Sequence, residues 1–309
     1  MVSFMMIAEN RTGINRKALG IGVLCYAVWG VLPLYWHLLE DWNPLFILAC
    51  RILFSAVFML LLLLCLGKIR QVFDVLRNRS AMKWLLPASI VITFNWGIYI
   101  WAVNSGRILD ASLGYYMNPL VVFALGYFIF HEKSGPLAWA ACAMAAVGVT
   151  FTTVLSGVVP FAAIALALSF AVYGMLKKAA RVDGMVSIAV ETLLMTPPAL
   201  LFLLLSPISR GALAAVTPGA ALLLIGAGAV TSVPLALYTR GVNDLPFTTM
   251  GFLQFIAPTF QLIIGLTVFK ESLRISAVIA FAVIWAGLIL YMADSFLKER
   301  KSRTLNNGN

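Results

Sequence analysis

Seven side chains that can bind or carry polar and charged groups lie within long apolar stretches of the sequence. Amides and phenols suit a cavity that holds an amphipathic or aromatic solute by hydrogen bonds and ring stacking. A guanidinium or a carboxylate is costly in an apolar stretch and by default faces a bundle interior or water. The pattern therefore indicates a candidate binding set: Arg51, Asn95, Tyr99, Tyr115, Asn118, Glu191 and Gln254.

The set contains two opposite charges at similar positions. Arg51 lies seven residues after Pro44, and Glu191 lies seven residues after Gly184. We expect Arg51 to orient an anionic or polar group, and Glu191 to be a protonatable group of the kind that relays protons in membrane proteins. Two alternatives remain open: Arg51 could reach the membrane surface or bond helix carbonyls, and Glu191 could lie one turn too shallow to contribute.

The uncharged members fall on shared helix faces. Asn95 and Tyr99 are spaced i, i+4, and Tyr115 and Asn118 are spaced i, i+3, so each pair would lie on one face of a helix. We expect these four residues and Gln254 to contact a solute. The alternative is hydrogen bonding between helices, which is worth about 0.6 kcal/mol per pair in membranes.

Signs of catalysis or of a metal site are missing from the sequence. The four cysteines lie in apolar runs without paired spacing, so we expect them to be small buried hydrophobic residues. His37 and His131 stand far apart. There is no phosphate-binding GxxxxGK[ST] motif, and no nucleophile accompanied by a base. We therefore expect no cofactor, no metal ion and no enzyme, with a membrane-embedded enzyme as the main rival class.

The elements that must position these residues are membrane-spanning helices. Of the 309 residues, 62% are hydrophobic and only 11% are charged, whereas a soluble domain has about a quarter charged. A spanning helix needs about 20 mostly apolar residues. Ten such runs are predicted, at about 18–39, 44–66, 84–104, 111–130, 136–154, 159–176, 185–206, 217–238, 246–269 and 275–293.

The basic residues predict the orientation of these spans. Most of the 22 basic residues fall in the N-terminal segment 1–17, the tail 294–309 and the even-numbered connectors, which include Lys177 and Lys178. Positive charge concentrates on the cytoplasmic side of membrane proteins. We therefore predict that both termini are cytoplasmic, and that the net charge of +10 reflects anionic lipid rather than nucleic acid.

An internal repeat divides the chain into residues 18–154 and 155–293. Ala27-Val28-Trp29-Gly30 recurs as Ala171-Val172-Tyr173-Gly174. Five spans in each copy would make the second copy inverted, an arrangement that secondary transporters use for alternating access. A second series of residues recurs at one constant offset: Pro119, Gly126, Phe130, Glu132 and Gly148 match Pro258, Gly265, Phe269, Glu271 and Gly287. The same offset makes Gln254 the repeat equivalent of Tyr115. We expect the two Glu residues to cap or brace short turns.

Four stretches of the sequence carry a resemblance to a known family. They are Tyr26–Pro33, Asn95–Asn104, Ser112 to Glu132, and Leu253 to Glu271. With Arg51, these stretches resemble the EamA-type transporters of the drug/metabolite transporter superfamily, most closely the RarD group, which is named for chloramphenicol sensitivity. The resemblance covers nearly the whole chain.

The resemblance implies a fold and a function class. It implies a bacterial inner-membrane protein with ten helices in two inverted EamA repeats, and a central cavity lined chiefly by spans one to four and six to nine. The expected function is secondary transport, with export of a small amphipathic, chloramphenicol-like molecule. An amino acid or related metabolite as the solute, and a non-transporting sensor, remain alternatives. The fifth and tenth spans resemble those that flank the bundle and would support a homodimer.

Overall fold

The computed structural model describes residues 16–104, 108–132, 134–156 and 161–268, with isolated helical positions between 282 and 293. For residues 100–104 and 108–116 only the backbone is described. Within these ranges the chain is helical and contains no strand. The helices are α2 (Arg16–His37), α3 (Pro44–Cys65), α4 (Ile69–Arg77), α5 (Arg79–Asn104), α6 (Ile108–Phe128), α7 (Pro136–Ser156), α8 (Phe161–Ala180), α9 (Gly184–Leu205), α10 (Pro207–Ala215), α11 (Pro218–Asp244), α12 (Phe247–Leu253) and α13 (Ile256–Thr267).

Side-chain caps and prolines start several of the long helices. Asn43 accepts a hydrogen bond from the amide of Leu45 (3.0 Å) at the start of α3, directly before Pro44. Asp183 accepts from Met185 (3.0 Å) and Val186 at the start of α9. These acceptors satisfy amides that have no partner within the helix, so the sequence fixes where these helices begin.

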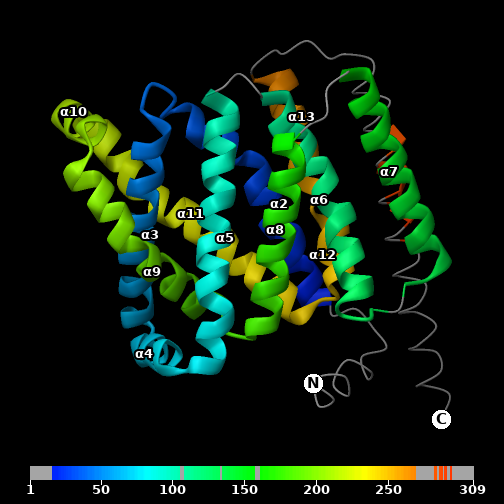
Figure 1. The fold of residues 1–309 in the computed structure, drawn as a ribbon, viewed down its shortest axis with the longest axis horizontal. Coiled ribbons are helices and arrows are strands. Elements are labelled where there is room, and N and C mark those ends of the chain that lie inside the picture. Colours follow the sequence, from blue (N-terminus) through cyan, green and yellow to red (C-terminus); the bar gives the residue numbers. More distant parts are fainter. Residues whose placement is uncertain are drawn as a thin grey trace.

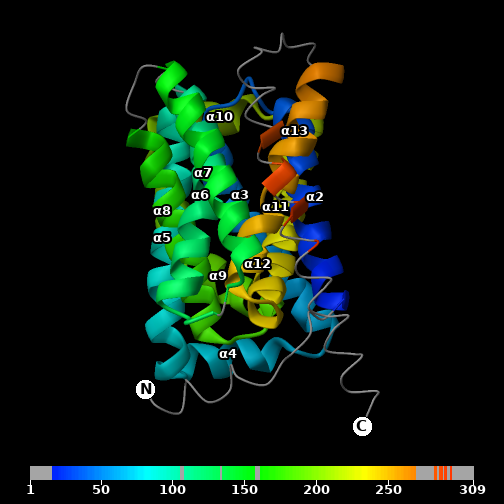
Figure 2. The same cartoon turned by 90° about the vertical axis from the view of Figure 1, so that its right-hand side faces the viewer.

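The long helices alternate in direction across a bundle that has α4 at one end and α10 at the other (Figure 1). We call these the α4 end and the α10 end. Helix α2 starts at the α4 end, whereas α8 finishes there and joins α9 through a short connection (Figure 2). Because α2 and α8 carry the two copies of the repeated Ala-Val-Trp/Tyr-Gly sequence, the copies run in opposite directions.

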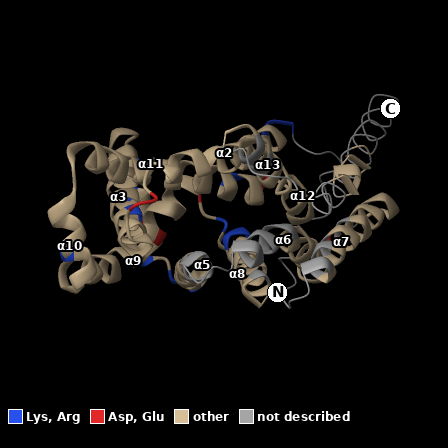
Figure 3. Cartoon of the chain, turned by 90° about the horizontal axis from the view of Figure 1, so that it is seen from above, with Lys and Arg blue, Asp and Glu red and all other residues tan. Residues whose placement is uncertain are grey.

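Viewed along the bundle, the helices form two facing rows (Figure 3). Helices α11, α2, α13 and α12 make one row, and α5, α8, α6 and α7 make the other. Helix α3 packs between α9 and α11 at one edge, and α12 packs against α6 at the other. The described part of the chain contains four helices long and apolar enough to cross a membrane: α2, α3, α9 and α11. Ten spans therefore stay a prediction.

Two predicted connectors are short helices, and one predicted span is interrupted. Helices α4 and α10 occupy segments expected to be loops, and the span expected at 246–269 is broken between α12 and α13. Pro258 has no N–H to donate to the carbonyl of Gln254, which instead accepts from Ala257, three residues on (3.2 Å). The interruption places Gln254 at a break in the helix.

The cysteines were expected to be buried. Cys25 and Cys50 are buried, but Cys142 is half-buried and Cys65 is exposed at the end of α3. The prediction is therefore wrong for Cys65, which faces outward from an apolar helix whose surface is available to lipid.

Candidate solute-binding site

Arg51 lies between two tryptophan rings. Its guanidinium carbon is 4.6 Å from the ring centre of Trp36 on α2 and 4.8 Å from that of Trp96 on α5. Its Nε donates to the hydroxyl of Thr231 on α11 (3.1 Å). Both rings are within the range at which an aromatic face attracts a guanidinium. Trp36 and Thr231 were not predicted as partners of Arg51, because both belong to other helices than Arg51.

Asn95 joins α5 to α8. Its amide nitrogen donates to the carbonyl of Leu166 (3.0 Å) and to the hydroxyl of Ser169 (2.8 Å), and its side chain is buried. Both hydrogens of the Asn95 amide therefore bind α8. This is the hydrogen bonding between helices that was the alternative to contact with a solute. Tyr99, one turn further on, is 40% exposed.

Asn118 and Gln254 are buried on two helices that pack together. The amide nitrogen of Asn118 donates to the carbonyl of Ala167 on α8 (2.7 Å). The side-chain oxygens of Asn118 and Gln254 are both buried without a hydrogen-bond partner. Tyr115 belongs to α6, but its side chain lies outside the described residues.

Glu191 is part of a buried ion pair. Its carboxylate accepts hydrogen bonds from Tyr173 (3.0 Å) and Ser187 (2.9 Å), and it pairs with the ammonium group of Lys177, which also donates to Ser187. The side chain of Lys177 is fully buried. Its assignment to a cytoplasmic connector is therefore wrong: α8 extends to Ala180 and carries Lys177 into the contact with α9.

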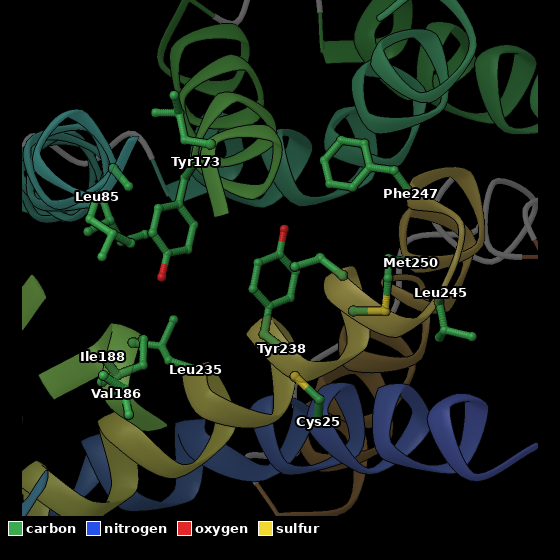
Figure 4. Packing of buried hydrophobic residues seen from close by; sticks show 14 of the residues in the cluster. Cys25, Leu85, Tyr173, Val186, Ile188, Leu235, Tyr238, Leu245, Phe247 and Met250 are labelled. Atoms are coloured by element: carbon green, nitrogen blue, oxygen red, sulfur yellow. The ribbon is translucent and has the colours of Figure 1, made fainter. Parts of the chain in front are cut away.

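Tyr173 also belongs to an aromatic cluster between α8, α11 and α2. Its ring stacks on that of Tyr238 at 6.1 Å and 12° (Figure 4). Tyr238 in turn contacts Tyr26 and Trp29 of α2. Gly174 permits this packing, because a Cβ at that position would collide with the hydroxyl of Tyr238. Its repeat equivalent, Gly30, likewise lies against Phe260 of α13.

Glu132, which follows α6, caps a helix of the other repeat. Its two carboxylate oxygens accept from the backbone amides of Phe247 (2.5 Å) and Thr248 (2.9 Å), the first residues of α12. Lys178 lies 3.4 Å from the same carboxylate and donates to the carbonyl of Leu245 (2.8 Å). Glu132 was expected to cap or brace a short turn, and it does so, although the turn before α12 is distant from Glu132 in the sequence. Glu271 lies outside the described residues.

Comparison with known proteins gives consistent matches over the chain. The model of the EamA-like transporter family matches residues 17–154 and again residues 158–293. The chain is 39% identical to the uncharacterized transporter YojE of Bacillus subtilis, covering 97% of this chain and 100% of the relative. It is 36% identical to the protein RarD of Streptomyces exfoliatus, covering 96% and 94%. A solved crystal structure shares the fold at 20% identity, with a TM-score of 0.71 over 89% of this chain and 96% of the other.

Proposed function

The chain belongs to the EamA-like transporter family and is a multi-pass membrane transporter rather than an enzyme, and from this premise we propose that it exports a small amphipathic solute by alternating access. The membrane is the bacterial inner membrane, and both termini are cytoplasmic. The RarD resemblance favours a chloramphenicol-like solute, and an amino acid or related metabolite is the alternative.

Two features support alternating access between inverted repeats. The family model matches two segments of nearly equal length, and the corresponding helices α2 and α8 run in opposite directions (Figure 2). Inverted repeats can exchange their arrangements and so open a central site to either side of the membrane. Basic residues of α4 and its flanks, including Arg70, Arg77 and Arg79, suggest that the α4 end is cytoplasmic.

The observation that carries the proposal is the polar contact between the repeats at the α4 end. Glu132 of the first repeat holds the first two amides of α12 and approaches Lys178, both in the second repeat. Phe247, whose amide Glu132 holds, and Tyr238 of the aromatic cluster both pack against Gly174 of α8. Opening toward the cytoplasm would separate these groups, so the described conformation corresponds to a state closed on that side.

The candidate residues divide into two roles within this proposal. Asn95, Tyr99, Tyr115, Asn118 and Gln254 contact the solute, and Arg51 orients an anionic or polar group on it. Glu191 would take part in proton coupling only if Lys177 moved away, because protonating Glu191 in the described arrangement would leave a buried ammonium without its anion.

Counterflow into proteoliposomes tests the proposal. Purified protein would be reconstituted with unlabelled solute inside, and labelled chloramphenicol, amino acids and nucleosides would be offered outside, with and without a proton gradient. We expect accumulation of at least one solute, and slower accumulation in Glu132→Gln. Saturable binding of a solute without accumulation, by folded protein, would overturn transport and indicate a sensor.

A further inference from the structure

Two buried amide oxygens in the bundle lack a hydrogen-bond donor. Asn118 on α6 is 2% exposed and Gln254 at the α12–α13 break is 6% exposed. Neither Oδ1 of Asn118 nor Oε1 of Gln254 has a partner. Buried polar atoms are nearly always hydrogen-bonded, because an unmade bond costs the whole desolvation of the group. Within the described part of the chain, neither oxygen meets a donor that would offset this cost.

The packing of α6 on α12 places Asn118 and Gln254 at the same level of the bundle. The helices are antiparallel, because Glu132 beyond the end of α6 caps the start of α12. They touch closely at Gly251, where a Cβ would lie 2.8 Å from Val122. Asn118 is four residues before Val122 and Gln254 is three residues after Gly251, so each lies one turn from this contact on the same helix face. Because the two helices run in opposite directions, the turn before Val122 on α6 and the turn after Gly251 on α12 lie at the same height along the bundle.

The chemistry of the pair is that of a cation site. An amide oxygen only accepts hydrogen bonds, so neither of these two oxygens can donate to the other. A monovalent cation or an ammonium group would satisfy both oxygens, and without a carboxylate in the pair a divalent ion would be held weakly. Interrupted helices of transporters bind ions through unwound backbone carbonyls, whereas Gln254 and Phe255 keep helical backbone angles, so the ligands here are side-chain oxygens.

We propose that Asn118 Oδ1 and Gln254 Oε1 form a cation site between α6 and the α12–α13 break. Its occupant is either an inorganic ion such as Na⁺ or the protonated amino group of the transported solute. The second source rests on the proposed transport function, whereas the first does not. Both sources share the same chemistry, a positive charge coordinated by uncharged oxygens.

Thermal unfolding of the purified full-length protein tests the site. NaCl or methylammonium chloride would replace N-methylglucamine chloride at constant ionic strength. We expect the Tm to rise saturably with one or both cations. Asn118→Leu and Gln254→Leu should each weaken the apparent affinity at least tenfold. Ser232→Ala is the matched control: its hydroxyl on α11 is also buried without a partner, and the cation response should persist there.

A charged variant keeps the test decisive if the leucine variants do not fold. Gln254→Glu retains the size of the side chain and adds a negative charge, so we expect at least tenfold tighter cation binding above the pH at which the carboxyl ionises. A response to Na⁺ alone would assign an ion site, and a response to methylammonium alone would assign a subsite for the solute. No response to either in the wild type and in Gln254→Glu would overturn the proposal and leave water or a direct amide–amide bond.

The counterflow experiment separates this inference from the proposed function. Cation binding without counterflow of any solute would leave the site in place and remove transport. Counterflow without any cation response would remove the site and leave transport in place.

Discussion

Arg51 and Glu191 occupy similar positions in the two repeats, yet the structure accommodates their charges in different ways. Arg51 lies between the rings of Trp36 and Trp96 and donates to a neutral hydroxyl. Glu191 is paired with the buried ammonium group of Lys177 and accepts two further hydrogen bonds. One charge is stabilised by aromatic faces, and the other by an opposite charge.

The difference follows from the chemistry of the two groups. A guanidinium is planar, delocalised and weakly hydrated, so aromatic faces can replace part of its hydration. A carboxylate concentrates its charge and needs donors or a cation once water is removed. The second arrangement uses both carboxylate oxygens within the protein. Glu191 in this arrangement therefore has no carboxylate oxygen left over for direct contact with a solute.

Removing the carboxylate from the ion pair should have the largest effect. Glu191→Leu leaves Lys177 buried without its anion, and we expect a loss of about 3–5 kcal/mol in the free energy of unfolding. SDS titration in mixed micelles would measure it. The double variant Lys177→Met, Glu191→Leu should recover most of the loss, because no buried charge remains. Wild-type stability of the single variant would contradict a buried pair.

Tyr173→Phe should have the next largest effect. It removes the hydroxyl that donates to Glu191 while keeping the ring stacked on Tyr238. Because the acceptor is charged, we expect a loss of about 1.5–3 kcal/mol in the same titration. Tyr238→Phe is the matched control, since the described residues offer its hydroxyl no hydrogen bond. Equal losses in the two variants would argue against the bond to Glu191.

Arg51→Lys tests whether the aromatic faces stabilise a guanidinium specifically. A compact ammonium cannot stack on both tryptophans at once, so we expect a loss of about 1–2 kcal/mol despite the retained charge. Arg240→Lys is the control, because Arg240 is exposed and pairs with Asp244 on the helix surface. If both variants matched the wild type, stacking on Trp36 and Trp96 would contribute no stability.

Thr231→Val should have the smallest effect. The substitution keeps the shape of the side chain and removes the acceptor of the Arg51 Nε bond, so we expect a loss of about 0.5–1.5 kcal/mol. The loss should disappear when the same change is made in the Arg51→Lys background, since that bond is then already absent. Additive losses in the double variant would show that Thr231 acts independently of Arg51.

Much of the fold could be predicted from hydrophobic runs and their interruptions. Helix α3 starts at Pro44 and α9 at Gly184, close to the expected limits, because their caps are local in sequence. The sequence predicts an interruption of the span 246–269 at Pro258, and the structure has one, at Gln254 and Phe255 just before that proline. Pro119 at the repeat-equivalent position lies within the unbroken helix α6, so a proline alone does not determine whether a helix is interrupted.

The candidate site was predicted as a set of residues but not as a set of contacts. Asn95, Asn118 and Gln254 are buried, as expected for polar groups facing a bundle interior. The sequence did not indicate that the amide hydrogens of Asn95 bind α8, or that Lys177 pairs with Glu191. Both contacts depend on which helix lies beside α5 and how far α8 extends, and neither is encoded within a single apolar run.

The sequence by itself determined that the chain is an apolar, helical, internally repeated protein of the EamA-like family, and it identified the few polar positions in its spans. These properties follow from composition and local periodicity, which depend on neighbours along the chain. Only the tertiary structure decided which polar groups are already satisfied and which are not. Arg51 meets Trp36 and Thr231, and Glu191 meets Lys177, because burial forces each charge to find a partner on an adjacent helix, and that adjacency exists only in the folded bundle.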